Sequence, residues 1–335
     1  MGTSAPEVLR VAVAGAGRMG TRHVRTFNAL AGVEVSVIFD PRPARACDLS
    51  EAMQRRCTQS YRTFLEQARR ADMAVVAGPT ATHFGVTRDL IGCGLSCLVE
   101  KPMTVRPREC LMLSRLARAC GTDLFCAHIE RFNSALQATA GLLRDHPWEE
   151  VSIIRHNPDS ARLSGDSIVT DLMIHDLDIV QHVMGLTPEA LLAVESEPGG
   201  QDRSAGEGAD HVAVRLQTDA GYPVTLSTGR LPENRQRAIH ARSAQGRLHV
   251  DLLTGRHDLQ FATWDLPSAP AAMAAGDALT RQAQAMVRSV RDGQSHGLAS
   301  AEESWQTLTL CQLIEQRLRL ASCGSIRLHQ GCGRP

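Results

Sequence analysis

The first 128 residues alternate short apolar runs with longer amphipathic runs. The apolar runs have the length of buried strands, and the amphipathic runs have helical periodicity. The expected strands are 9–14, 33–39, 73–77, 97–99 and 123–127, and the expected helices are 19–30, 44–56, 84–92 and 106–120. Strands and helices in alternation predict an α/β fold with a doubly wound parallel sheet.

The pattern changes after residue 128. The later elements are expected as helices at 134–144, 167–185, 277–291 and 301–318, with a strand at 151–155 and four period-two runs between 211 and 253. Alternation with period two is typical of strands that have one covered face. We therefore expect two domains, 1–128 and 129–335. The second is an α+β domain with an open, largely antiparallel sheet, and its final helices are free to pack back on the first domain.

A glycine-rich turn follows the first expected strand. Gly15-Ala16-Gly17-Arg18-Met19-Gly20 has the spacing Gly-x-Gly-x-x-Gly. The first glycine allows a tight turn, the second lets a pyrophosphate approach the backbone, and the third lets the helix pack closely on the sheet. The pyrophosphate then lies at the positive end of the helix dipole. Such turns are common, but the strand before it, the helix after it and Asp40 twenty residues later together predict a dinucleotide-binding Rossmann domain.

Asp40 ends the second expected strand and bears on which dinucleotide binds. A carboxylate at this position accepts hydrogen bonds from the adenosine ribose hydroxyls and repels a 2′-phosphate. This favours NAD. Arg42, two residues later, would neutralise a 2′-phosphate or simply lie in solvent, so NADP stays the less favoured alternative.

Glu100-Lys101-Pro102 follows the expected strand at 97–99. The carboxyl ends of the strands face the ligand crevice in a doubly wound sheet, so Lys101 is expected in the site.

The expected helix at 167–185 carries a polar stripe beside an apolar one. The polar stripe is Asp171, His175, Asp178 and His182, and the apolar stripe is Leu172, Ile179 and Val183. Spacings of four, three and four residues place the polar side chains on one face. Such a face is an ordinary solvated surface in many helices, and its ligand types also suit a metal. Together with Lys101 and the glycine turn, it predicts a catalytic edge without a metal.

These residues resemble the glucose-fructose oxidoreductase, inositol dehydrogenase and MocA-like family of nicotinamide-dependent oxidoreductases. The resemblance covers nearly the whole chain and is carried by the glycine turn, Pro79 with His83, Glu100-Lys101-Pro102, and Asp171 with His175. The segments HIERFN (128–133) and DLMIHDLDI (171–179) resemble the branch that contains UDP-N-acetylglucosamine 3-dehydrogenases and related amino-sugar and aminoglycoside dehydrogenases.

The resemblance implies that His175 is the general base, that Lys101 polarises the reacting oxygen and that Asp171 orients one of them. Oxidation of an alcohol needs a base that works near neutral pH, which suits imidazole, and an ammonium group favours alkoxide character. Cofactor contacts are expected from Gly15, Ala16, Gly17, Arg18, Met19, Gly20, Asp40, Arg42, Pro79, Thr80, His83, Glu100 and Lys101.

The function implied is an NAD-dependent dehydrogenase that oxidises a ring secondary hydroxyl of a sugar, amino sugar or aminoglycoside-type substrate to a ketone. One alternative is a non-catalytic dinucleotide sensor, which has no need of Lys101 and His175. Another is an imine or enone reductase on the same scaffold, which mainly needs a proton donor.

The substrate is left open by the charged residues near the expected crevice. Besides Lys101, Asp171 and His175, the expected substrate contacts are His128, Arg131, Arg155 and Arg162. Guanidinium groups suit the diphosphate of a nucleotide sugar. The carboxylates of Glu130, Asp159 and Asp166 would equally hold the ammonium groups of an aminoglycoside.

Composition narrows the class of partner. The 335 residues have 36 basic and 36 acidic side chains, so no net field attracts nucleic acid or an anionic membrane. No apolar stretch is long enough to span a bilayer, and the first residues lack a signal-peptide pattern, so we expect a cytoplasmic protein. The ten cysteines include no Cys-x-x-Cys pair and are expected to be reduced packing residues.

We also expect a homodimer or homotetramer. The sheet between Val212 and Leu253 covers one face with its own helices, and its other face is expected to carry Val, Ile, Leu and His in period two.

Overall fold

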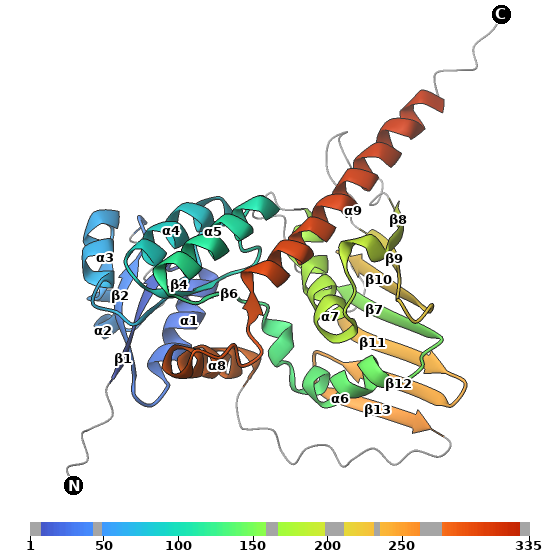
Figure 1. Cartoon of the computed structure of the whole chain (residues 1–335), viewed down its shortest axis with the longest axis horizontal. Coiled ribbons are helices and arrows are strands. Elements are labelled where there is room, and N and C mark those ends of the chain that lie inside the picture. The colour runs from blue at the N-terminus through green and yellow to red at the C-terminus, as the bar shows by residue number, and fades with distance from the viewer. Residues whose placement is uncertain are drawn as a thin grey trace, which may run out of the picture. The chain divides into compact units, whose positions relative to one another are not determined.

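The computed structural model describes residues 8–42, 49–158, 167–197, 211–230, 235–261 and 277–328, with side chains up to 195 and 321 in the third and the last of these segments (Figure 1). The chain forms two compact units. Unit 1 comprises Met1–Phe132 and Ala274–Trp305, and unit 2 comprises Asn133–Met273 and Gln306–Pro335. Unit 1 therefore combines the first part of the chain with a segment close to its end.

A seven-stranded sheet forms the centre of unit 1. Its strands are β1 (Leu9–Ala14), β2 (Val33–Phe39), β3 (Cys57–Thr58), β4 (Met73–Val76), β5 (Ser96–Val99), β6 (Leu124–Cys126) and β14 (Ala299–Ser300). The order is β14-β6-β5-β4-β1-β2-β3, and every pair is parallel except β14 with β6. This confirms the expected doubly wound sheet. The carboxyl ends of its parallel strands share one edge, where such sheets bind ligands.

Helices cover both faces of this sheet. They are α1 (Arg18–Asn28), α2 (Glu51–Gln54), α3 (Tyr61–Ala68), α4 (Thr80–Gly92), α5 (Pro107–Cys120), the 3₁₀ turn η2 (Ile129–Phe132) and α8 (Ala278–Asp292). Figure 1 shows α4 and α5 on one face and α1 with α8 on the other. Val24 and Phe27 of α1 share a buried apolar cluster with Ala283, Met286 and Val287 of α8. The late helix α8 is thus part of the core of unit 1.

Local sequence explains where these helices begin and end. Pro107 occupies the first turn of α5, where its missing N–H costs nothing, and the Glu109 side chain accepts a hydrogen bond from the Arg106 N–H. The helix ends at Gly121, whose φ of +67° suits a residue without Cβ. Of the expected helix at 44–56, Glu51–Gln54 is helical, while residues 43–48 lie outside the described chain.

A second seven-stranded sheet forms the centre of unit 2. Its strands are β7 (Glu150–His156), β8 (Leu191–Glu197), β9 (His211–Gln217), β10 (Pro223–Gly229), β11 (Gln236–Ser243), β12 (Gly246–Asp251) and β13 (Arg256–Phe261). The order is β13-β12-β11-β7-β10-β9-β8, and only β7 with β10 is parallel. The expected open, largely antiparallel sheet is confirmed.

One face of this second sheet packs on helices of its own unit. The helical elements of unit 2 are α6 (Ser134–Asp145), the π-helical turn η3 (Val169–Met173), α7 (Ile174–Met184), the 3₁₀ turn η4 (Pro188–Ala190) and most of α9 (Ala301–Leu328), which starts in unit 1. The covered face carries Val212, Val214, Leu216, Val224, Leu226, Ile239 and Val250, all buried.

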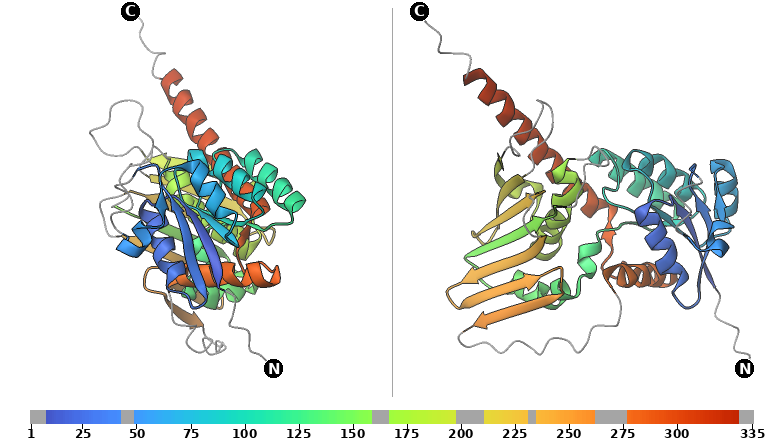
Figure 2. Two further views of the ribbon diagram at one scale, coloured as in Figure 1. Left: turned by 90° about the vertical axis from the view of Figure 1, so that its left-hand side faces the viewer. Right: turned by 180° about the vertical axis from the view of Figure 1, so that it is seen from behind.

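The opposite face corrects one expectation. It carries mainly polar side chains, among them Ser152, Thr225, Ser227, His240, Arg242, Arg247 and His249. Figure 2 (right) shows no described helix over it. The expectation that this face carries Val, Ile and Leu between residues 212 and 253 is wrong, because these side chains in β9, β10, β11 and β12 point to the covered side. The expected histidines, His240 and His249, do lie on the open face. The argument for a homo-oligomer from an apolar sheet face therefore falls.

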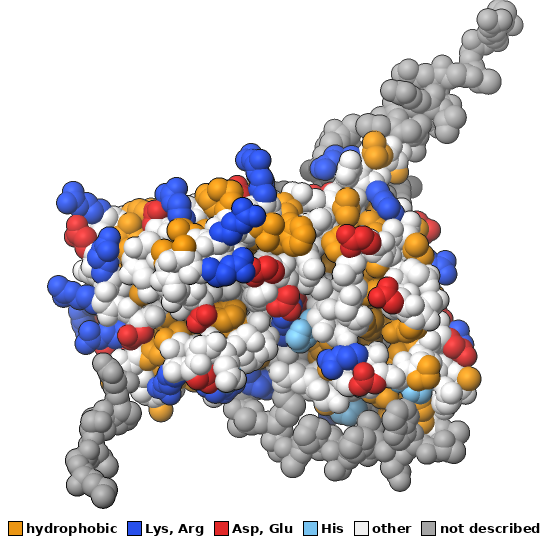
Figure 3. Space-filling model, viewed as in Figure 1, with side chains coloured by type: hydrophobic (Ala, Val, Ile, Leu, Met, Phe, Trp, Pro, Cys, Tyr) orange, Lys and Arg blue, Asp and Glu red, His pale blue; other side chains and the backbone are white. Residues whose placement is uncertain are grey.

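The surface matches the balanced composition. On the side shown in Figure 3, basic and acidic side chains are interspersed. Among the described residues, no helix is both long and apolar enough to cross a membrane. The seven cysteines whose side chains the structure describes are free thiols, and Cys97, Cys110, Cys126 and Cys311 are buried.

Candidate functional site

The glycine turn lies between β1 and α1. Gly15 has a φ of +107°, and a Cβ there would lie 2.7 Å from backbone atoms of Ala77 and Gly78. A Cβ at Gly20 would lie 1.9 Å from the carbonyl oxygen of Gly15. Gly17 precedes α1, and no described side chain caps this helix. The turn therefore requires glycine at two positions and leaves the first N–H groups of α1 for an anion such as a pyrophosphate.

Asp40 lies directly after β2 and next to this turn. Its carboxylate is buried and accepts hydrogen bonds from the N–H groups of Ala16 and Arg42, both at 3.0 Å. The Arg42 guanidinium lies 3.6 Å from the same carboxylate and is more than half exposed. A carboxylate has about four acceptor sites. Asp40 thus holds the turn in place and keeps capacity for ribose hydroxyls.

The geometry of this edge fits a bound NAD. The glycine turn lacks Cβ atoms where a pyrophosphate would approach, α1 begins there with its positive dipole end, and an acidic side chain stands at the end of the neighbouring strand. Of the expected cofactor residues, the segment Gly15–Gly20, Asp40 and Arg42 lie together at the carboxyl ends of β1 and β2.

The turn after β4 lies beside the segment that follows β5. Pro79 precedes α4, and the Thr82 hydroxyl donates to the Pro79 carbonyl oxygen at 2.7 Å. His83 is buried, and its Nδ1 and Nε2 lie 2.9 Å from the carbonyl oxygens of Pro102 and Gly78. The start of α4, where Thr80 is the first residue, is thus tied to Glu100-Lys101-Pro102.

Glu100 forms a buried ion pair that the sequence motifs do not predict. Its Oε1 lies 2.7 Å from Nε2 of His23 in α1, and both side chains are buried. Burial alone would raise the pKa of Glu100, but the hydrogen bond from His23 and the positive charges of His23, Lys101 and His83 hold that pKa below its usual value. A buried, ionised carboxylate therefore stands beside Lys101.

Lys101 is the only lysine in the sequence, and all the other basic residues among the 36 are arginine. The guanidinium of arginine does not lose its proton in proteins, whereas an amine exchanges protons and shifts its pKa readily. The single amine side chain of this chain thus stands at the carboxyl end of β5. The sequence alone carries this signal, which motif spacing does not reveal.

In unit 2, Asp171 lies in the π-helical turn η3, which continues into α7. Nη2 of Arg230 lies 3.4 Å from its carboxylate. His175, in the first turn of α7, is half-buried like Asp171, whereas Asp178 is buried and His182 is exposed. The four residues therefore do not form one uniform polar edge.

Two other expected substrate residues of unit 1 are buried. His128 is 2% exposed and Arg131 is 4% exposed. Nη1 of Arg131 lies 2.8 Å from Oε1 of Glu303. Burial opposes ionisation of Glu303, but the Arg131 charge and the Ser300 N–H outweigh it and lower the pKa of Glu303. Arg131 thus already forms an ion pair within unit 1.

Arg155, a third expected substrate residue, lies in β7 and is 1% exposed. It forms an ion pair at 2.8 Å with Asp176 of α7, which is fully buried, and its Nε lies within 3.0 Å of both carboxylate oxygens. A substrate phosphate would have to compete with this carboxylate. Arg162, with Asp159 and Asp166, lies outside the described residues.

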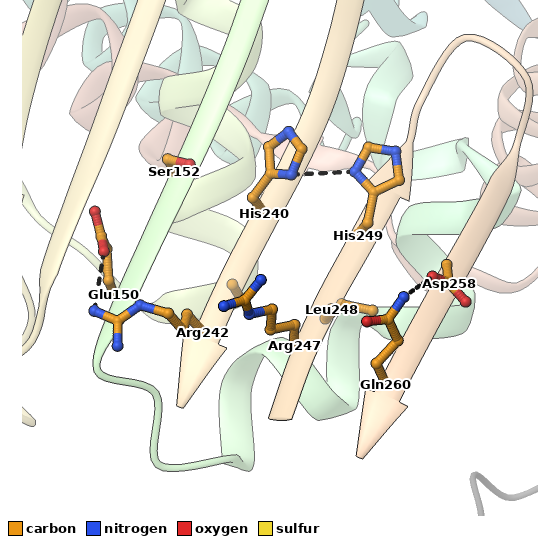
Figure 4. Close-up of a pocket in the computed structure, with 10 residues that line it drawn as sticks. Glu150, Ser152, His240, Arg242, Arg247, Leu248, His249, Asp258 and Gln260 are labelled. Atoms are coloured by element: carbon orange, nitrogen blue, oxygen red, sulfur yellow. Dashed lines mark hydrogen bonds and ion pairs between the residues drawn. The ribbon is translucent and has the colours of Figure 1, made fainter. Parts of the chain in front are cut away.

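A hollow of about 410 Å³ lies on the open face of the unit 2 sheet, away from every expected catalytic residue (Figure 4). His240 and His249 point toward each other across it, with their Nδ1 atoms 3.2 Å apart. Burial and the charge of His249 lower the pKa of His240. Within the described residues, no group of three or more His, Cys, Asp and Glu side chains is arranged to hold a metal ion.

Comparison with known proteins places these features in context. Residues 9–128 match the model of an oxidoreductase family with an NAD-binding Rossmann fold, GFO_IDH_MocA. The chain is 29% identical over 188 residues to UDP-N-acetylglucosamine 3-dehydrogenase of Acidithiobacillus ferrooxidans. This alignment covers 56% of this chain and 58% of that protein. It is 26% identical over 330 residues to inositol 2-dehydrogenase of Leifsonia xyli subsp. xyli, covering 96% and 95% of the two chains.

Solved structures share the fold. The Acidithiobacillus ferrooxidans 3-dehydrogenase superposes with a TM-score of 0.77 at 22% identity, covering 91% of this chain and 96% of that one. GenD2 from gentamicin A biosynthesis, in complex with NAD, superposes with a TM-score of 0.75 at 20% identity, covering 94% and 95%. The sequence alignment spans less than two thirds of the Acidithiobacillus ferrooxidans 3-dehydrogenase, so this similarity does not assign the substrate of that enzyme to this chain.

Proposed function

Because the chain belongs to the Gfo/Idh/MocA oxidoreductase family, whose Rossmann domain binds NAD, we propose that it is a sugar dehydrogenase. It oxidises a ring secondary hydroxyl of a sugar, amino sugar or aminoglycoside-type substrate to a ketone. The observation that carries this proposal is the position of Lys101. The only lysine of the chain follows β5, in the same unit and at the same sheet edge as the glycine turn and Asp40.

Each catalytic residue has a chemical role in this proposal. His175 accepts the hydroxyl proton, and the Lys101 ammonium stabilises the negative charge that develops on the same oxygen. Asp171 holds a negative charge one helical turn before His175, which favours the protonated imidazole. Bound NAD supplies the hydride acceptor for this oxidation. Lys101 belongs to unit 1, and Asp171 and His175 belong to unit 2.

The substrate class is proposed from the relatives. The names of the two aligned relatives refer to a UDP-amino sugar and to inositol, and that of one structural neighbour to the aminoglycoside gentamicin. All three compounds contain a six-membered ring with secondary hydroxyls. We propose a ring of this kind as substrate, with NAD preferred over NADP, in a cytoplasmic enzyme that forms a homodimer or homotetramer.

The test is an absorbance assay at the nicotinamide band. Purified protein with NAD is given UDP-amino sugars, inositols and aminoglycosides in separate reactions, and Lys101→Ala serves as the control. Reduction of NAD by wild type alone supports the proposal. Binding of NAD without turnover on any compound favours the sensor, and oxidation of NADH by imines or enones only favours the reductase. Light scattering measures the oligomeric state, and a strict monomer contradicts the proposed homodimer or homotetramer.

A further inference from the structure

Buried histidines fasten the segment that carries Lys101 to two helices of unit 1. His23 of α1 bonds to the Glu100 carboxylate at 2.7 Å, and His83 of α4 bonds to the Pro102 carbonyl oxygen at 2.9 Å. The two helices follow β1 and β4, which lie next to each other and to β5 in the sheet. The residues immediately before and after Lys101 are therefore each held by a different histidine.

His83 is held by two acceptors at once. Its Nδ1 faces the carbonyl oxygen of Pro102 and its Nε2 faces that of Gly78, each at 2.9 Å. The His83 side chain is 1% exposed, so these two carbonyl oxygens take the place of water around its ring nitrogens. His83 thus ties the Pro102 carbonyl oxygen to the turn that precedes α4.

Glu100 links His23 to the backbone of Lys101. Its Oε1 accepts from His23, and its Oε2 accepts from the backbone N–H of Lys101 at 3.3 Å. The carboxylate is ionised, since its pKa lies below the usual value even though burial opposes ionisation. One buried anion thus joins His23 to the backbone of Lys101 and lies in the field of His83.

We propose that His23 and His83 are positioning residues for Lys101, which they hold through Glu100 and Pro102. This inference rests on the proposed role of Lys101 as the group that stabilises the reacting oxygen. Burial of ionic groups is costly, and apolar residues of similar volume often stabilise an interior at least as well. What the polar set adds is direction, because Glu100, held by His23, bonds to the Lys101 N–H, and His83 bonds to the Pro102 carbonyl oxygen. A displacement of about 1 Å at such a group lowers turnover by roughly 100-fold.

The kinetic test compares variants that keep or remove the hydrogen-bond donor. His23→Gln keeps one donor toward Glu100, whereas His23→Leu removes it, and His83→Gln leaves at most a single donor group for two carbonyls. We expect kcat to fall about 10- to 100-fold in His23→Leu and His83→Gln and less in His23→Gln, with the KM for NAD within about twofold. His146→Gln is the control, because His146 is also buried and bonded, to Ser243 in unit 2.

A second test does not depend on activity. Reductive methylation with ¹³C-formaldehyde labels Lys101 as the only lysine, apart from the terminal amine, and gives one side-chain resonance. We expect this resonance to shift in His23→Leu and His83→Gln and to stay in place in His146→Gln.

The outcomes separate the two proposals. An unchanged Lys101 resonance and unchanged kcat in the variants overturn the positioning role. Shifted resonances in a protein that oxidises none of the sugars leave the positioning role intact and overturn the proposed function. If a histidine variant does not fold, Glu100→Gln replaces it, since this change keeps the shape and removes the charge that joins His23 to the Lys101 backbone.

Discussion

The two units hold their proposed catalytic residues in different ways. In unit 1, Lys101 follows a buried carboxylate, and His23 and His83 fix the backbone on both sides of it. In unit 2, Asp171 and His175 are half-buried, and the Arg230 guanidinium approaches the Asp171 carboxylate only to 3.4 Å. The cofactor-binding unit thus has the backbone around its proposed catalytic residue set by buried hydrogen bonds, whereas the proposed catalytic side chains of the other unit are half-buried.

The largest effect is expected at Lys101, in the tightly held unit. Lys101→Ala should lower kcat/KM by about 100- to 10,000-fold, the usual range for loss of an acid–base or electrostatic group. Lys101→Arg should not restore activity, because the guanidinium is larger and planar and spreads its charge, whereas the ammonium is a compact point charge. Steady-state kinetics at the nicotinamide band measures both, and calorimetry should give unchanged NAD affinity. Near-normal turnover of Lys101→Arg would show that a positive charge alone is enough.

In unit 2 the expected effects are graded. His175→Ala should lose about 100- to 10,000-fold in kcat, since no other base replaces the imidazole. Asp171→Asn should lie between this variant and wild type, because the amide keeps the shape but loses the charge. The fold loss in kcat of the double variant Lys101→Ala/His175→Ala should be smaller than the product of the two single losses, because both groups serve one transition state. Strict multiplicativity would mean that the two residues act in separate steps.

A smaller effect is expected at Asp40. Loss of charge-assisted hydrogen bonds to the ribose should raise the KM for NAD about 10- to 100-fold in Asp40→Ala. Removal of the carboxylate also ends its repulsion of a 2′-phosphate, so the preference for NAD over NADP should narrow. Asp40→Asn is the matched control, since it retains an acceptor for the Ala16 N–H and thereby preserves the turn. A wild type with equal KM values for both cofactors would contradict the role of Asp40.

The strongly periodic parts of the fold were predictable from the sequence. The run HVAVRLQ coincides with β9, and the helix predicted at 277–291 differs from α8 by one residue at each end. Strand β13 was missed because its residues alternate between half-buried and exposed, which leaves little hydrophobic contrast. Helix α9 extends ten residues beyond the predicted end, since neither glycine nor proline marks a stop at Leu318.

The site was predictable only where a motif fixes it. The glycine turn and Asp40 lie where expected, because their spacing follows from one β-α-β connection. The pairing of His23 with Glu100 joins residues 77 positions apart and depends on how α1 lies on the sheet, which no local pattern encodes. The arginines expected to bind substrate were assigned by residue type alone, and the burial of Arg131 and Arg155 depends on tertiary packing.

The smallest effect concerns helix α8, which brings a late segment into the tightly held unit. Asp277 caps this helix by accepting a hydrogen bond from the Thr280 N–H at 2.9 Å. That bond is the main reason why the pKa of Asp277 lies below its usual value. Asp277→Ala should therefore destabilise unit 1 by about 1 kcal/mol, whereas Asp277→Asn keeps a capping oxygen and should cost less.

The two variants also separate the hydrogen bond from the charge. A carboxylate with a lowered pKa in the folded state stabilises the protein above its unfolded pKa of about 3.9, and this contribution disappears as the pH falls through the folded-state pKa. Thermal melts should show wild type more stable than Asp277→Asn at neutral pH, and the difference should shrink as the pH falls below the unfolded pKa of about 3.9. A difference that persists in acid would mean that the cap acts through shape and not through its charge at the helix start.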